Sequence, residues 1–358
     1  ESKHKKELNR NERREMISRY GKNLKYDPYY NPNLSLDNED LTYSFEPRII
    51  KPWRDYIEFI CPFHRGDVLI GIQVANYYHS IGKNIRFHVS KDLINWVNDF
   101  SPEFEVLEIP IDLPKAIDTM EYFEKSVEFV RMRDDFSGRI ARSHPKMDFD
   151  FMGLNILENM LNELDVSIDS KIVPLKPIKK FNLSEDFKYE INKLYDDNSK
   201  VILIHPFGGW DLKNIPLNIL DEIVEVCKNK NIKLIQIGGK DDKKIPNLDG
   251  WILKNYSLSE WRIIFEKSDL LIGVDSWTSH LSAILNTNQI VLYGSTRGRD
   301  VNIKKFLTEQ NDNYIILESN IDCSPCHLLE CKYKYAYCKG YNFDKNMILR
   351  FLNKSLYD

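Results

Sequence analysis

Short apolar runs alternate with amphipathic stretches from about residue 55 onward, and this alternation predicts parallel α/β structure. The apolar runs have strand length, and the first amphipathic stretch ends at Gly82, as a helix commonly does. In this half we expect strands at 56–61, 85–89 and 104–109, and helices at 68–80 and about 115–165. Strand, helix and strand at this spacing predict right-handed crossovers between parallel strands.

The second half repeats the alternation more clearly. Its first strand candidate, 201–205, is almost continuously apolar, as a strand covered on both faces requires. We expect strands at 201–205, 232–237, 270–274 and 289–293, and helices at 217–228, 258–267, 278–285 and 346–358. The fold class predicted is α/β, with two facing, doubly wound, Rossmann-like domains and a ligand cleft between the carboxyl ends of their sheets.

Composition shifts suggest where the domains begin and end. A Pro- and Lys-rich segment at 173–180 is typical of a linker. The expected units are an N-terminal extension at 1–52, an acceptor domain at 53–172, a linker at 173–198, a nucleotide-sugar domain at 199–345 and a C-terminal helix at 346–358. The extension either wraps the domain or meets a partner, or it is a solvated tail.

Charge and hydropathy exclude some classes of protein. The 358 residues carry a formal net charge of only −4, so no basic field indicates nucleic-acid binding. No apolar run is long enough to span a bilayer, so at most peripheral membrane contact is expected. We expect a cytoplasmic protein.

The six cysteines are unevenly distributed. Cys61 and Cys227 stand alone in apolar segments, which indicates buried thiols. The other four crowd together at Cys323, Cys326, Cys331 and Cys338, and His327 lies among them. In a reducing compartment such a cluster favours a structural Zn or Fe ion over disulfides, with His327 able to replace one thiolate. Four reduced thiols, or cross-links formed after isolation, remain open.

A first polar loop, His64-Arg65-Gly66-Asp67, follows the first strand candidate. Asp67 would lie at the mouth of the cleft, where a carboxylate could take the proton of an attacking acceptor hydroxyl. His64 and Arg65 would lie on the acceptor side. The alternative is that Asp67 merely caps the following helix.

Two further loops suit a diphosphate. The segment 205–213 ends a strand in Gly208 and Gly209 and then supplies Lys213, so that backbone N–H groups and an ammonium could cradle phosphates, although a plain turn is the alternative. The segment 273–283 brings four polar side chains onto the first turn of a helix, namely Asp275, Ser276, Thr278 and His280. Their hydroxyls and N–H groups at a positive helix end could stabilise a departing diphosphate. Asp275 and Ser276 could instead be caps, and His280 a core histidine.

Taken together, these segments resemble the ADP-heptose:lipopolysaccharide heptosyltransferases, glycosyltransferase family 9. The matching motifs are Gly66-Asp67-Val68-Leu69, the segment 205–213, Gly273 to Ala283 with its Asp-Ser and His-Leu pairs, the strand 291–296 and the Cys-x-Pro-Cys cluster. The resemblance covers roughly residues 55–350.

The resemblance implies a bacterial-type GT-B enzyme that takes a sugar from an ADP-linked donor, cytoplasmic or at the inner face of the membrane. It implies that Asp67 is the base of an inverting transfer and that Lys213, Ser276, Thr278 and the amides of the glycine pair hold the leaving diphosphate, without a catalytic divalent metal. Asp241 or Asp242 could receive the donor ribose.

Departures from the family pattern bear on the acceptor. Trp277 stands where the family usually has Gly, which should narrow the pocket beside the diphosphate. Relatives that glycosylate autotransporter adhesins carry a metal-bound cysteine cluster and form large assemblies, so a protein acceptor and a homo-oligomer are expected alongside a saccharide acceptor. A nucleotide-sugar epimerase of the same fold, and a non-enzymatic metal-binding assembly scaffold, are the alternatives.

Overall fold

The computed structural model of the chain describes most of residues 56–357. The described residues are 56–110, 119–133, 135–143, 155–162, 172–178, 183–195, 199–227, 232–307, 313–319, 321–326, 328, 330–333 and 344–357. The expected N-terminal extension at 1–52 lies outside them, as do His327 and Cys338. No helix among the described residues is long and apolar enough to cross a membrane.

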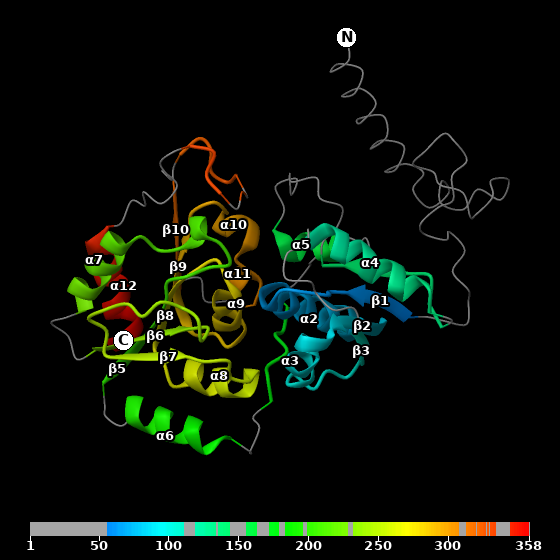
Figure 1. Ribbon diagram of the computed structural model, residues 1–358, viewed down its shortest axis with the longest axis horizontal. Helices are drawn as coiled ribbons and strands as arrows, with labels where there is room; N and C mark the ends of the chain where they lie inside the picture. Colours follow the sequence, from blue (N-terminus) through cyan, green and yellow to red (C-terminus); the bar gives the residue numbers. More distant parts are fainter. Residues whose placement is uncertain are drawn as a thin grey trace, which may run out of the picture.

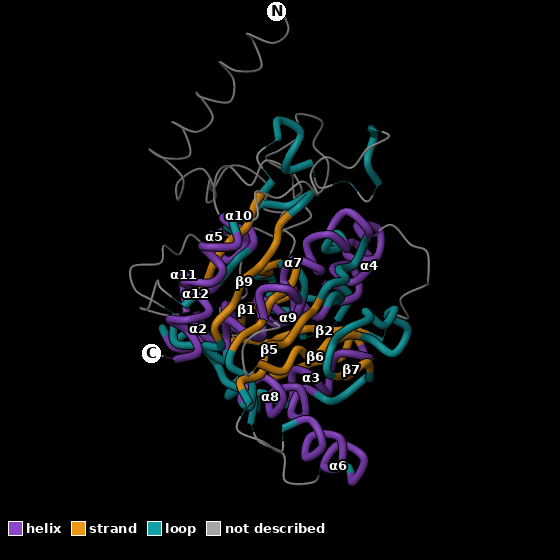
Figure 2. The backbone as a smooth tube through the Cα atoms, turned by 90° about the vertical axis from the view of Figure 1, so that its left-hand side faces the viewer, coloured by secondary structure: helices purple, strands orange, loops and turns teal. Residues whose placement is uncertain are grey.

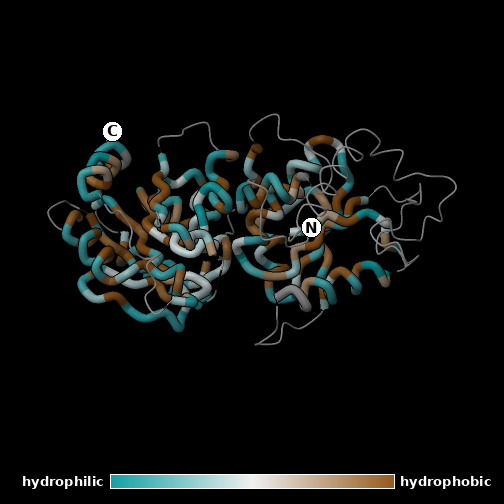
Figure 3. Tube along the Cα trace, turned by 90° about the horizontal axis from the view of Figure 1, so that it is seen from above, coloured by the Kyte–Doolittle hydropathy of each residue, from teal (hydrophilic) through white to brown (hydrophobic). Residues whose placement is uncertain are grey.

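The chain forms two lobes, each built on a parallel sheet (Figures 1 and 3). The first lobe has a four-stranded sheet in the order β3-β2-β1-β4. Its elements are β1 (Tyr56–Ile60), α2 (Arg65–Ser80), β2 (Asn84–Ser90), a 3₁₀ turn (Lys91–Leu93), α3 (Ile94–Asn98), β3 (Glu105–Ile109), α4 (Thr119–Arg131), β4 (Ile140–Arg142) and α5 (Ile156–Asn162).

The second lobe has a six-stranded sheet in the order β10-β9-β8-β5-β6-β7. Its elements are α6 (Glu185–Leu194), β5 (Lys200–His205), a 3₁₀ turn (Asp211–Lys213), α7 (Leu217–Cys227), β6 (Ile232–Gly238), β7 (Gly250–Leu253), α8 (Leu258–Glu266), β8 (Leu270–Val274), α9 (Trp277–Ile284), β9 (Asn288–Tyr293), α10 (Gly298–Val301), α11 (Lys304–Leu307), β10 (Tyr314–Glu318) and α12 (Lys345–Tyr357). Renumbered from β5, the strand order is the 3-2-1-4-5-6 of a Rossmann sheet.

The predicted fold class is confirmed, with local differences. The long helical region expected at about 115–165 is wrong, because β4 lies between α4 and α5 and pairs with β1. β4 has only three residues, too few to produce a recognisable apolar run. The strands β7, with four residues, and β10, with five, were also not predicted. α6 lies inside the segment 173–198, and its N-cap Ser184 accepts a hydrogen bond from the backbone N–H of Phe187.

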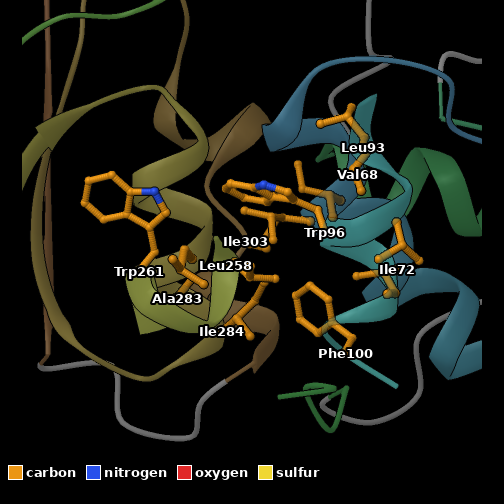
Figure 4. Close-up of a cluster of buried hydrophobic side chains, with 14 of the residues drawn as sticks. Val68, Ile72, Leu93, Trp96, Phe100, Leu258, Trp261, Ala283, Ile284 and Ile303 are labelled. Carbon is orange, nitrogen blue, oxygen red and sulfur yellow. The ribbon is translucent and has the colours of Figure 1, made fainter. Parts of the chain in front are cut away.

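Alternating side chains along β5 divide the second lobe into two layers. Ile202 and Ile204 face a core formed with α7 and α12, whereas Val201 and Leu203 face α8 and α9. Figure 2 shows the strands as a layer with helices on either side. The α8–α9 layer does not end at the lobe boundary: its core continues without interruption into that of α2 and α3 (Figure 4). The two lobes therefore share one hydrophobic seam, in addition to the chain that links them.

One charged side chain is enclosed in this packing. Lys304, the first residue of α11, is fully buried beside α9, and its ammonium donates a hydrogen bond to the backbone carbonyl of Thr287. Burial lowers the pKa of Lys304 to about 7, because the enclosure penalises the charged form.

This burial predicts that the free energy of unfolding rises with pH between about 7 and 10.5. In that range the unfolded lysine still binds a proton while the folded lysine is neutral, which contributes up to about 1.4 kcal/mol per pH unit. Lys304→Met should remove this rise. The free energy of unfolding, measured in urea, should therefore increase from about pH 7 to about pH 9 by more in the wild type than in the variant. The exposed neighbour variant Lys305→Met is the control. A pH-independent difference for Lys304→Met would contradict the prediction.

Candidate active site

The three polar loops lie at the topological switch points of the two sheets. β5 and β8 are neighbours at the centre of the second sheet, and the strand order continues outward from them in opposite directions. The first sheet has the corresponding point between β1 and β4. Loops leaving the carboxyl ends of such strands diverge and open a crevice for a ligand. The loop after β1 carries Asp67, and those after β5 and β8 carry Lys213 and Asp275.

Helix α2 of the first lobe packs against helix α9 of the second, and their first turns meet. The contact is close at Gly66: a Cβ atom added there would lie 3.1 Å from Cδ2 of His280 and 3.7 Å from the backbone N of Trp277. A side chain at this position would require His280 to move by a few tenths of an ångström, and glycine avoids that displacement. The turn that carries Asp67 therefore lies against the turn that runs from Asp275 to His280.

Asp67 lies in the first turn of α2 and does not cap it. The helix begins at Arg65, earlier than expected, and its N-cap is His64, which makes no side-chain capping bond and has a left-handed backbone (φ 60°). Asp67 is half-buried, and its negative charge acts on the ring of His280 across the lobe boundary. Asp67 is therefore not the N-cap residue of α2. His64 is exposed and Arg65 half-buried on the same turn.

Lys213 and Asp275 form an ion pair at the centre of the second lobe's crevice. Lys213 Nζ lies 2.7 Å from Asp275 Oδ2, and the two side chains are only 12% and 7% exposed. The Thr296 hydroxyl donates a hydrogen bond of 2.9 Å to the same Asp275 oxygen. Burial raises the pKa of Asp275, but Lys213, His280 and the Thr296 hydrogen bond outweigh it, so that the pKa is lowered overall. Asp275 is thus a buried carboxylate that stays ionised.

Burial lowers the pKa of His280, and the charges of a carboxylate from each lobe, Asp275 and Asp67, act to raise it. Lys213 also lowers the pKa, so the two carboxylates only partly offset the decrease. The ring is therefore neutral at neutral pH. A neutral imidazole has a single N–H, so it can donate a hydrogen bond to one carboxylate at most, without neutralising it.

The glycine pair differs in part from its expected role. The Gly208 N–H donates to the side-chain oxygen of Asn214 at 2.9 Å, so this amide already has a partner. Gly208 is needed for a different reason: an added Cβ would lie 2.5 Å from Cβ of Lys213. Gly209 is exposed, with open space where a side chain would be. The lysine is therefore positioned by close packing on Gly208, and Gly209 alone keeps the role of amide donor.

The start of α9 supplies hydroxyl groups as expected. Ser276 is the N-cap residue, but its side chain does not cap the helix. Thr278 is fully buried, and its hydroxyl has no hydrogen-bond partner among the described residues. Such orphaned buried groups are uncommon, and each calls for an explanation such as an absent ligand.

Asp242 has a structural task, whereas Asp241 is exposed. The Asp242 carboxylate accepts a 2.8 Å hydrogen bond from the Gly239 N–H and thereby closes the turn after β6. Of the two candidates for the donor ribose, Asp241 is the exposed one.

The described cysteines of the cluster, Cys323, Cys326 and Cys331, are half-buried. Among the described residues no three His, Cys, Asp or Glu side chains form a group that could hold a metal. Three thiols alone thus do not make the expected centre, and with Cys338 outside the described residues the metal site stays a prediction. The loop itself is tied to the site, because the Cys326 N–H donates to the Ser295 carbonyl at 3.1 Å.

Several site residues were not assigned a role from the sequence. The Trp210 ring lies under Lys213 Nζ, 3.8 Å from ring centroid to nitrogen, and its indole N–H donates to the Ser295 hydroxyl. Thr296 holds Asp275, as described above. Both residues lie in segments that the motifs cover, so their position within those motifs could have indicated a place in the site. Trp96 of α3 also reaches the lobe boundary, and nothing in its local sequence indicates this.

Residues 165–336 match the family model described as glycosyltransferase family 9 (heptosyltransferase). No curated protein sequence matches the chain. Three solved structures share the fold. The iron-containing dodecameric glycosyltransferase TibC from enterotoxigenic E. coli H10407 has a TM-score of 0.59 at 14% identity, over 84% of this chain and 76% of that one. TibC in complex with ADP-D-β-D-heptose has a TM-score of 0.58 at 14% sequence identity, over 85% of this chain and 77% of that one. E. coli ADP-heptose LPS heptosyltransferase II has a TM-score of 0.53 at 12% sequence identity, over 84% of this chain and 98% of that one.

The two parallel-sheet lobes have the two-domain GT-B fold of these heptosyltransferase structures. The residues that match the family model include Lys213 and Asp275. Residues 165–336 are thus similar to glycosyltransferase family 9.

The contact at Gly66 predicts a specific defect for Gly66→Ala. The added methyl group must push His280 and α9 away by a few tenths of an ångström, and displacements of about 1 Å can cost about 100-fold in rate. We expect glycosyl transfer to slow about 10-fold or more, while thermal stability holds or rises because Ala favours a helix over Gly by about 1 kcal/mol.

Gly239→Ala is the matched control, since the atoms nearest its added Cβ are 4.0 Å away. The steady-state rates and the melting temperatures of both variants are compared with those of the wild type. Full activity in Gly66→Ala would mean that this approach does not set the geometry of the site.

Proposed function

We propose that the protein transfers heptose from an ADP-linked donor to a hydroxyl group of a saccharide or protein acceptor, with inversion at C1. The observation that carries the proposal is the meeting of two first turns across the lobe boundary, one with Asp67 and the other following Asp275. The family and the donor complex of TibC support ADP-heptose as the donor.

The second lobe is suited to hold the donor. Its loops after β5 and β8 carry the Lys213 ammonium and lead into the positive end of α9, where the Thr278 hydroxyl lies in the first turn. A diphosphate entering there would draw on Lys213, which is held ready by Asp275 and the Trp210 ring. Ser276, Gly209 and Asp241 would complete the donor contacts. The charge that develops on the leaving ADP would thus meet groups already oriented for it.

The first lobe would supply the base. Asp67 takes the proton of the acceptor hydroxyl as its oxygen attacks C1, the new C1–O bond forms, and the bond from C1 to the phosphate oxygen breaks. ADP leaves with the electron pair of that bond. Because attack comes from the face opposite the diphosphate, the configuration at C1 inverts. His64 and Arg65 stand on the same turn and would face the acceptor.

The cellular setting follows from the same assignment. We expect a cytoplasmic enzyme that meets its donor in solution, with membrane contact at most peripheral. TibC is described as dodecameric, which supports the expectation of a homo-oligomer.

A thermal-shift panel tests the donor. A ligand present at 100 times its Kd stabilises the fold by about 2.7 kcal/mol, which is readily seen as a higher melting temperature. We expect ADP-heptose and ADP to raise the melting temperature, while UDP- and GDP-linked sugars leave it unchanged. A shift with UDP- or GDP-sugars and none with ADP-heptose would overturn the donor assignment. Consumption of donor without any acceptor would instead point to an epimerase.

Replacement of the base tests the chemistry. Asp67→Asn keeps the shape of the side chain but removes its basicity, so kcat should fall about 10²- to 10⁴-fold while ADP binding is retained. Asp186→Asn is the matched control, because Asp186 also lies in the first turn of a helix but is exposed on α6. Rates come from ADP release and affinities from calorimetry. Wild-type kcat in Asp67→Asn would eliminate this carboxylate as the base.

A further inference from the structure

A row of aromatic side chains crosses the boundary between the lobes beside the proposed reaction centre. Trp96 of α3 belongs to the first lobe, and its indole extends toward the helices of the second lobe (Figure 4). Its ring meets that of Trp277, the first residue of α9, edge to face at 5.5 Å between centroids. Trp277 in turn packs against Trp261 of α8 at 5.1 Å and His205 of β5 at 6.0 Å.

This packing differs from the expectation that Trp277 narrows the pocket beside the diphosphate. The ring contacts of Trp277 are with Trp96, Trp261 and His205, all within the seam. The aromatic partner of Lys213 is another residue, Trp210. The backbone of Trp277 therefore belongs to the proposed donor-binding turn, whereas its side chain packs away from the charged groups proposed to bind the donor.

The same row is attached to the turn that carries the proposed base. The Arg65 guanidinium lies 4.8 Å from the centroid of the Trp96 ring, and Arg65 is two residues before Asp67. Burial lowers the pKa of Arg65, and a partly desolvated guanidinium interacts more strongly with an aromatic face. Arg65, Trp96 and Trp277 thus form a continuous path from the Asp67 turn to the first residue of α9.

We infer that the Trp96–Trp277 contact is a positioning device that sets the orientation of the Asp67 turn relative to the donor-binding turn of α9. It acts together with the close approach of Gly66 to His280, which limits the distance between the same two turns. One contact prevents the turns from separating, and the other prevents them from closing further. Trp277 is then a positioning residue for transfer, and the inference rests on the proposed function.

A double-mutant cycle tests the inference through kinetics. Trp96→Leu and Trp277→Leu should each lower kcat about 10- to 100-fold, since small misplacements of reacting groups have effects of this size. The donor KM and the Kd of ADP should stay within about 3-fold of wild type. The double variant should be no more than about 3-fold worse than the poorer single variant, because both remove the same contact. Trp277→Phe, which keeps a ring, should recover most of the lost rate.

Trp251→Leu is the control for loss of an indole elsewhere, since Trp251 lies in β7 and bonds to the Ile245 carbonyl. It should keep the wild-type kcat. Three results would overturn the inference: a Trp277→Leu defect confined to donor KM or ADP affinity, a silent Trp96→Leu, or losses that multiply in the double variant.

Hydrogen exchange separates this inference from the proposed function, because it needs no substrate. Trp277→Leu should speed amide exchange in the first turns of both α2 and α9 and leave β5 and β6 protected. Trp277→Phe serves here too, should the Leu variant fail to fold. If the wild-type protein transfers no heptose, faster exchange in both turns would still uphold the contact as the link between them. Unchanged exchange at the α2 turn would refute it whatever the reaction.

Discussion

The approach of Gly66 to His280 is the contact on which the site depends. It allows the first turns of α2 and α9 to meet, and so joins a carboxylate of one lobe to the ion pair of the other. Neither lobe contains the whole site, because Asp67 follows β1 while Lys213 and Asp275 follow β5 and β8. The proposed chemistry would therefore require a fixed relation between the two sheets, and the shared hydrophobic seam of α2, α3, α8 and α9 provides one.

Electrostatics within the crevice follow from burial. Asp275 can remain ionised inside the second lobe because Lys213 and the Thr296 hydroxyl bind the same oxygen. His280 is kept neutral by burial although carboxylates of both lobes act on it. The donor-side loops thus carry a paired lysine and, at a positive helix end, the Thr278 hydroxyl, which has no hydrogen-bond partner among the residues that the structure describes. In the proposed reaction, an incoming diphosphate would bind Lys213, which Asp275 already holds in position.

Aromatic residues perform two separate tasks around this crevice. Trp210 holds the lysine from the loop after β5, bridging to Ser295 after β9. Trp277 faces the other way, into the seam, where Trp96 meets it from the first lobe. A large side chain at the start of α9 is therefore compatible with a donor site, because its bulk is absorbed between the lobes.

The sequence by itself determined the alternation of strands and helices, the parallel α/β class and the three polar loops, because periodicity and turn chemistry are local properties. It could not reveal short strands such as β4, which depend on a neighbour for their hydrogen bonds. Nor could it assign the Gly208 amide to Asn214, or place the Trp277 ring against Trp96 between the lobes. These depend on which elements pack together, and that choice is made by contacts between residues far apart in the chain.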